Sequence, residues 1–439
     1  MALAVLAVAI VLLLILIGLK IDAFLALLVV AFLAGVLNGM SPDAALKSLL
    51  KGVGDTIGSL GLIVVFGAIL GKTIEESGAA HAIATWLTGK FGISRVQHAV
   101  LITAFLVGLA MFFQPAFFLL IPLIYTLSAS TGLPLIQLAI PFCSALSVTH
   151  GFLPPHPGVT AVAVTLHADV NRTLLYGLII GVPTMLVAGP ILARLVRGIH
   201  TQPPARLFRE RKFAPEDLPG LGPSLAAVLA PILIMLAGSA IALTTSGGNA
   251  LGSAVRFVSE PNVVLFLAVL LAFYLLGIRR RQSVESLMKQ VAEAIASVSP
   301  ALFVVAGGGA FKQVLLDGGT GEAVRALVSQ MNVSPLLLAW GAAALLRGAV
   351  GSATVAAITA AGIVLPIVPS SGVRPELITL AIGAGSISLS HFSDSGFWIF
   401  KEYFDLDVRQ TLATWTLMEV VIGLLGLVGV LVLNLVLGA

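Results

Sequence analysis

Two short segments combine helix-breaking residues with side chains that can bind an anion or carry a proton. The first spans 150–158 and reads His-Gly-Phe-Leu-Pro-Pro-His-Pro-Gly, inside an apolar region. Proline removes a backbone donor and clashes with the preceding turn, so this segment is not expected to remain helical. Backbone groups freed at membrane depth are tolerated only where protein or a water-filled cavity meets them. We interpret the segment as an unwound stretch lining a substrate site, with an external loop between two short helices as the alternative.

The second segment spans 391–398 and reads His-Phe-Ser-Asp-Ser-Gly-Phe-Trp. Its aspartate, Asp394, lies between apolar runs, where a charged residue costs about 2.5–3.5 kcal/mol on insertion scales. Such a residue is expected to have a charged or hydrogen-bonding partner, or a functional role. We predict that Asp394 couples transport to protons, because a carboxyl group can load a proton on one side and release it on the other. A structural acceptor for nearby amides is the alternative.

A third irregular segment, 347–355, has glycines on either side of a turn, and its counterpart in the first half is 112–117. A hairpin tip that begins a new helix presents unpaired amides and a positive dipole end, which suit a carboxylate. Arg347, at the start of this segment, either binds substrate or lies at the membrane interface.

The predicted substrate-binding residues are the polar and helix-breaking members of these four segments. They are His150, Gly151, Pro155, His156, Gly351, Ser352, Thr354, His391, Ser393, Ser395, Gly396 and Gln114. The three histidines could donate to an anion or relay a proton, and a structural role is as plausible for each. No metal, cofactor or catalytic residue is predicted. The coupling ion is expected to be a proton, with sodium as the alternative.

The composition indicates which elements must position these residues. Hydrophobic residues make up 58% of the 439, charged residues make up 10%, and the mean hydropathy is +1.08. The apolar residues form continuous blocks near the length of about 20 residues that a membrane-spanning helix needs. A transmembrane barrel would instead show short alternating strands. The fold class is therefore an all-α polytopic membrane protein. The single cysteine, Cys143, excludes disulfides within the chain and is expected to be a small buried residue.

The two halves of the chain resemble one another. The segment 169–174 matches 407–412 at four of six positions, and each opens the last long apolar block of its half. Two further matches lie upstream in the same order: Thr149-His150 with Ser390-His391, and 76–83 with 317–324. Similar order and spacing indicate a duplication. The predicted units are a first transmembrane repeat over 1–198, a basic cytoplasmic linker over 199–220 and a second repeat over 221–439.

The crossing count predicts that the second repeat is inverted. If the apolar pairs 97–112/117–130 and 334–350/354–368 are re-entrant hairpins, each half crosses five times, giving about ten transmembrane helices. The basic residues form two clusters, which the positive-inside rule assigns to the cytoplasm: Arg194, Arg197, Arg206, Arg209, Arg211 and Lys212, then Arg279, Arg280, Arg281 and Lys289. Both termini then lie outside the cytoplasm. Inverted repeats with discontinuous helices are the architecture of secondary transporters.

At the irregular segments the chain resembles the gluconate:proton symporter (gluconate permease) family of the ion transporter superfamily. The motifs lie at 151–158, 351–355, 394–398 and 401–404. The resemblance implies proton-coupled uptake of gluconate or a related sugar acid or small hydroxycarboxylate through the bacterial inner membrane, by a protein that forms homodimers. Two positions depart from the family pattern: Gln114, where a glutamate is common, and Ser393, where an asparagine is common.

Two other functions remain as alternatives to a transporter. An intramembrane enzyme would need a metal or nucleophile constellation, and the sequence has no His-Glu-x-x-His, Gly-x-Ser-x-Gly or paired cysteines. An anion channel would show rings of charge or a continuous polar stripe rather than isolated broken helices.

Overall fold

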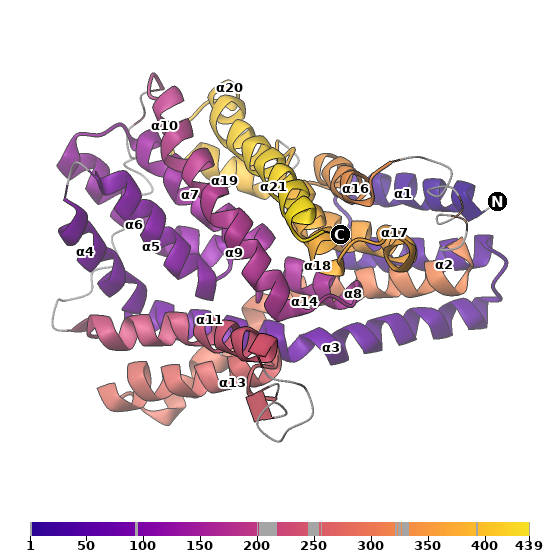
Figure 1. The fold of residues 1–439 in the computed structure, drawn as a ribbon, viewed down its shortest axis with the longest axis horizontal. Helices are drawn as coiled ribbons and strands as arrows, with labels where there is room; N and C mark the ends of the chain where they lie inside the picture. Colours follow the sequence, from indigo (N-terminus) through magenta and orange to yellow (C-terminus); the bar gives the residue numbers. More distant parts are fainter. Residues whose placement is uncertain are drawn as a thin grey trace.

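The all-α prediction is confirmed by a computed structural model. It describes residues 2–92, 95–199, 217–244, 257–320, 333–391 and 394–438, with the separate positions 201, 254, 255, 323 and 326. Every regular element over these residues is a helix (Figure 1). Eight helices within them are long and apolar enough to cross a membrane. The predicted total of about ten crossings stays a prediction.

The order of elements repeats between the halves: a pair of helices, a long helix, a hairpin, a broken helix and a last long helix. The first half holds α1 (Ala2–Gly18), α2 (Ala23–Leu37), α3 (Pro42–Ser77), α4 (Ala79–Phe91), α5 (Val96–Ala110), α6 (Phe113–Thr131), α7 (Leu135–Phe152), α8 (Pro157–Thr165), α9 (Val170–Leu186), η2 (Val187–Ile191) and α10 (Leu192–Leu195). The second holds α11 (Leu221–Thr244), α13 (Pro261–Ala272), η4 (Phe273–Gly277), η5 (Ile278–Arg280), α14 (Val284–Asp317), α16 (Pro335–Val350), α17 (Ala353–Val364), η6 (Leu365–Ser370), α18 (Pro375–Ile387), α19 (Ser395–Tyr403), α20 (Val408–Thr411), η7 (Leu412–Thr416) and α21 (Leu417–Val436).

The long helices α3 and α14 pack against each other in antiparallel directions, and Figure 1 shows α3 along one edge of the molecule. Near the start of α3, the Ser48 hydroxyl donates to Asp317 at the end of α14 over 2.7 Å. Near the end of α3, Lys72 lies 3.3 Å from Glu293, close to the start of α14. Equivalent helices of the two halves thus run in opposite directions. An inverted duplication requires this relation, and the inversion relative to a membrane stays a prediction.

The helix pairs of both predicted hairpins are present, as α5 with α6 and α16 with α17, and their re-entrant course in the membrane stays a prediction. The second turns at Gly351, whose φ of 76° is a left-handed conformation that glycine adopts at low cost. Ser352 then caps α17, its side chain accepting a hydrogen bond from the amide of Val355 at 3.4 Å. The next helix therefore begins directly at the hairpin tip.

Both broken helices are also present, as α7/α8 and α18/α19. The first break is shorter than predicted, because α7 continues through His150 and Gly151 and ends at Phe152. Only 153–156 is non-helical, and Pro157 begins α8, at a position where its missing N–H is not needed. In the second break, α18 ends at Ile387 and α19 begins at Ser395.

Two further details differ from the sequence interpretation. The hydropathy of the sequence predicts apolar helices over 56–75 and 297–316, whereas α3 and α14 begin well before these ranges, with polar first turns capped by Ser41 and Ser283. Helix α4 was not predicted as a separate block. Most of the predicted linker 199–220 lies outside the described residues.

Candidate functional site

A cavity of about 660 Å³ lies where the hairpin tips of both halves meet the breaks in α7/α8 and α18/α19. Its lining comes from both hairpins, both broken helices, η7 and α21, with α3 and α14 contributing residues as well. The predicted residues that line it are His150, Gln114, Gly351, Ser352, Thr354, Asp394, Ser395 and Gly396. The chain thus brings together residues that are more than 200 positions apart.

Four helices begin at this cavity. The lining includes the first residues of α6, of α8 at Pro157, of α17 at Ala353 and of α19 at Ser395. Neither Phe112, before α6, nor His156, before α8, caps its helix with a side-chain hydrogen bond. Amides at a helix N-terminus point outward and carry a partial positive charge. These four N-termini favour an anion, although the described lining has three carboxyl groups, those of Glu75, Asp394 and Glu419, and one cationic side chain, Arg347.

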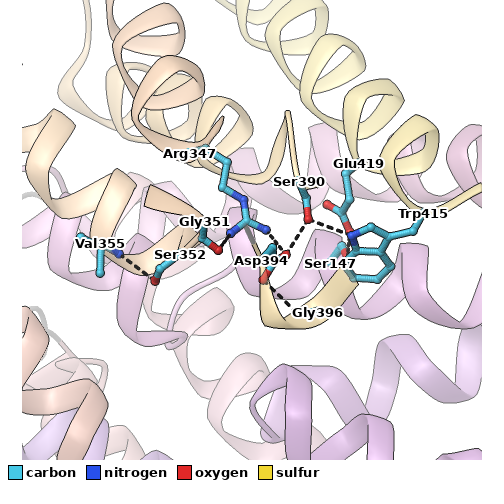
Figure 2. A network of polar contacts seen from close by, with 10 residues as sticks. All are labelled: Ser147, Arg347, Gly351, Ser352, Val355, Ser390, Asp394, Gly396, Trp415 and Glu419. Carbon is cyan, nitrogen blue, oxygen red and sulfur yellow. Dashed lines mark hydrogen bonds and ion pairs between the residues drawn. The ribbon is translucent and has the colours of Figure 1, made fainter. Parts of the chain in front are cut away.

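A buried ion pair joins the hairpin α16/α17 to the second broken helix (Figure 2). One terminal nitrogen of Arg347 lies 2.5 Å from Asp394 Oδ2, and the other donates to the carbonyl of Gly351 over 2.5 Å. Asp394 also accepts from the hydroxyl of Ser390 at 2.5 Å and from the amide of Gly396 at 2.9 Å. Asp394 is therefore paired, hydrogen bonded and the N-cap of α19 at once.

The indole of Trp415 extends this network by donating to the Ser390 hydroxyl over 2.8 Å. Beside it, the Ser147 hydroxyl donates to the Glu419 carboxylate at 2.5 Å (Figure 2). Ser147 comes from α7 and Glu419 from α21, and both line the cavity. Glu419 is 2% exposed, so this second carboxyl group is more deeply buried than Asp394 at 8%.

The remaining predicted residues lie beside the cavity rather than in its described lining. His156 Nε2 lies 2.7 Å from the carbonyl oxygen of Gly108, and its ring is 5.7 Å from that of His150. Gly151 packs against Ile387 and Gly383 of α18. Pro155 and His391 are not among the described lining residues, and Ser393 lies outside the described residues. Their proposed contacts with substrate stay predictions.

Sequence reasoning missed several lining residues, chiefly Glu419, Ser147 and Trp415. Glu419 carried a usable signal, because it is the only acidic residue in the last apolar block, 410–437. An ionisable residue inside a membrane segment is a candidate functional residue by default. Ser147 had no comparable signal, since serine is common in such helices.

No group of three or more His, Cys, Asp or Glu side chains that could hold a metal ion occurs in the part of the chain that the structure describes. The cavity lining offers amides, hydroxyls and one guanidinium for an anion, together with three carboxyl groups that could carry a proton, those of Glu75, Asp394 and Glu419.

Three curated relatives match nearly the whole chain. The chain is 47% identical over 426 residues to the Gnt-II system L-idonate transporter of Escherichia coli K12, covering 97% of both chains. It is 43% identical over 427 residues to a high-affinity gluconate transporter of the same organism, covering 97% of this chain and 98% of the relative. Gluconate permease of Bacillus licheniformis is 43% identical over 434 residues, with 97% of both chains covered.

Two solved structures share the fold. The Alcanivorax borkumensis YdaH transporter superposes with a TM-score of 0.65 at 15% identity, covering 94% of this chain and 97% of the other. Neisseria gonorrhoeae MtrF superposes with a TM-score of 0.66 at 17% identity, covering 94% of both. The family model described as GntP family permease matches residues 1–436. The chain therefore belongs to the GntP family of permeases, and it is a multi-pass integral membrane transporter rather than an enzyme.

Proposed function

We propose that this permease takes up gluconate or a related sugar acid or small hydroxycarboxylate across the inner membrane, coupled to protons and by alternating access. The relatives named above are gluconate and idonate transporters, which supports a sugar acid as the substrate class. The observation that carries the proposal is the cavity where four helix N-termini, Arg347 and several hydroxyl groups converge.

The chemistry of the cavity matches a hydroxylated carboxylate. Such a substrate has one anionic end and several hydroxyl groups, so it needs positive donors at one point and neutral hydrogen-bonding groups around it. The start of α17 offers the positive donors, beside Arg347, whose charge is paired with Asp394, and Ser352, Thr354 and Gln114 offer neutral partners. The volume of about 660 Å³ lies within the usual range for small-molecule sites, about 300–1,000 Å³.

Alternating access is supported by the symmetry of the parts around the cavity. Each half contributes one hairpin tip and one broken helix, so a movement of one half relative to the other would open the site to one side or the other. The antiparallel contact between α3 and α14 supports an inverted second repeat with about ten crossings. A homodimer, implied by the family resemblance, is part of the same proposal.

Proton coupling is supported by the presence of carboxyl groups in the cavity lining, including Asp394, the residue predicted from the sequence. A symporter needs a group that binds the coupling ion in one orientation and releases it in the other. A carboxyl group fits protons, and sodium is the alternative ion.

Proteoliposomes test this function directly. Purified protein should accumulate radiolabelled gluconate or idonate when the outside is made acidic, and collapse of the pH gradient by a protonophore should abolish accumulation. Accumulation driven by a sodium gradient alone would identify sodium, and not the proton, as the coupling ion. A non-saturating flux that only equilibrates the anion would instead identify a channel. Mass measurement of the purified protein in detergent tests the homodimer.

A further inference from the structure

We infer that Glu419, hydrogen bonded to Ser147, is the carboxyl group that takes up and releases the coupling proton, whereas Asp394 stays ionised as the counter-charge of Arg347. This inference rests on the proposed proton-coupled uptake and identifies the residue that performs it. Glu419 belongs to none of the irregular segments, so neither the sequence motifs nor the broken helices pointed to it.

The contacts of the two carboxyl groups differ in kind. Asp394 accepts from the Arg347 guanidinium, from the Ser390 hydroxyl and from the Gly396 amide. The guanidinium and the amide can only donate, so they stabilise the ionised form. Protonating Asp394 would break an ion pair and leave Arg347 as a buried unpaired cation. For Glu419, the Ser147 hydroxyl is the only hydrogen-bond partner found among the described residues. A proton can join Glu419 without breaking any ion pair.

Serine suits both protonation states of its partner. A hydroxyl group donates to an ionised carboxylate, and after rotation it can accept from a protonated one. The 2.5 Å contact between Ser147 Oγ and Glu419 Oε1 can therefore persist while the proton comes and goes. An arginine or a backbone amide in the same place could only donate, and it would hold the carboxylate in its ionised form.

The charged and titratable groups around Glu419 lie on several neighbouring elements. Arg347 on α16, Asp394 before α19 and Glu75 on α3 line the same cavity, and the first two form a neutral pair. On α7, Cys143 and His150 lie one turn to either side of Ser147. Helices α9 and α18 also pack against α21, with Gly429 near Ile180 and Gly426 near Ala384, and their titratable residues lie toward the other end of α21: Arg172, Tyr176 and Glu376.

This arrangement couples the proton to the anion by simple electrostatics. Arg347 and Asp394 neutralise each other, and Glu75, the third carboxyl group of the lining, lies 4.0 Å from the Lys72 ammonium group. An ionised Glu419 would therefore be a buried negative charge without a cationic partner among the described residues, and it would repel an incoming carboxylate. When a proton from the aqueous side joins Glu419 Oε, that repulsion disappears and the anion can bind. The proton and the anion therefore enter together, and loss of the proton on the other side expels the anion.

The test compares Glu419→Gln with the parent and with Glu285→Gln, an exposed carboxyl group on α14 that serves as a matched control. For one proton per anion, a gradient of one pH unit supports about a tenfold accumulation in the parent. We expect Glu285→Gln to match the parent. Glu419→Gln should accumulate no substrate above equilibrium, yet it should keep counterflow exchange of labelled for unlabelled gluconate, with an apparent KM independent of pH.

A second variant guards against a purely structural effect. Glu419→Asp keeps a titratable group, so it should retain accumulation that Glu419→Gln loses. The inference is overturned if Glu419→Gln accumulates substrate like the parent, or if both variants lose accumulation and counterflow alike. A parent that shows no accumulation driven by a pH gradient overturns the proposed function itself, and the inference with it, so the two failures are distinguishable.

Discussion

Arg347 and Asp394, which are 47 positions apart in the sequence, form an ion pair of 2.5 Å, and both residues are buried. The second nitrogen of Arg347 holds the carbonyl of Gly351 at the hairpin tip. The tip of α16/α17 is therefore tied to the start of α19 by one side chain. The sequence left two roles open for Arg347, and this geometry excludes an exposed position at a membrane interface.

The first prediction concerns the stability that this pair provides. Arg347→Ala leaves Asp394 as an unpaired buried carboxylate, so we expect a loss of about 3–5 kcal/mol in the free energy of unfolding. Thermal unfolding of the purified protein in detergent measures this loss. Combining Arg347→Ala with Asp394→Asn removes both charges and should recover most of the lost stability. A double variant as unstable as Arg347→Ala would show that the unpaired carboxylate is not the cause of the lost stability.

The second prediction concerns the hairpin tip. Ser352→Ala and Thr354→Ala each remove a hydroxyl group from the cavity, and one lost hydrogen bond of about 0.5–1.5 kcal/mol corresponds to a rise of roughly two- to tenfold in the apparent KM. Uptake kinetics at matched protein levels measure it. Because Ser352 also caps α17, Ser283→Ala, at the cap of α14, is the control. Unchanged kinetics in both cavity variants would remove the tip from the site.

The hairpins and broken helices were predictable because the residues that create them act locally. Gly351 allows the left-handed turn at the hairpin tip, and the prolines after Phe152 end α7 whatever packs around them. The extents of α3 and α14 were less predictable, since hydropathy marks the apolar part of a helix and misses its polar first turns. Caps such as Ser41 mark those starts.

The site was predictable only in part, because its partners are set by packing between distant segments. The sequence identified Asp394 as a buried charge, and nothing local pointed to Arg347 as its partner or to Ser147 as the partner of Glu419. His150 and His156 share one segment, yet only His150 is in the described lining, since His156 bonds to Gly108 on α5. Spacing along the chain cannot separate two such residues.

The third prediction concerns the crossing of α7 and α18, which links the two halves at the site. A Cβ atom on Gly383 would lie 2.2 Å from the backbone oxygen of Gly151, so the helices would have to separate. We expect Gly383→Ala to lower the amount of folded protein, with a cost of about 1–3 kcal/mol. Gly54→Ala on α3 is the control, because no other atom lies near its Cβ position. Equal amounts of both variants after purification would contradict the close crossing.

The fourth prediction concerns topology. In intact cells, a membrane-impermeant thiol reagent should modify a single cysteine introduced at 246 and should leave one introduced at 209 unreactive, because the basic clusters are assigned to the cytoplasm. The native Cys143 is fully buried, so the parent protein should give little background labelling. Labelling at 209 without permeabilising the membrane would reverse the assignment and the inverted topology with it.

The fifth prediction separates the roles of the two buried carboxyl groups of the cavity, Asp394 and Glu419. The sequence alone assigned proton coupling to Asp394, and its contacts with Arg347, Ser390 and Gly396 favour a permanently ionised group instead. Asp394→Asn should therefore retain accumulation driven by a pH gradient, normalised to folded transporter. Because the substitution frees the charge of Arg347, the anion should bind more tightly, and both the apparent KM and the maximal rate should fall. Uptake assays in proteoliposomes over about pH 5.5–8 measure the accumulation, the apparent KM and the maximal rate.

If Asp394→Asn instead loses accumulation while keeping counterflow, Asp394 is the proton site and Glu419 is not. If neither Asp394→Asn nor Glu419→Gln loses accumulation, His150, His156 and His391 become the next candidates for the proton site, because imidazole groups can also relay a proton.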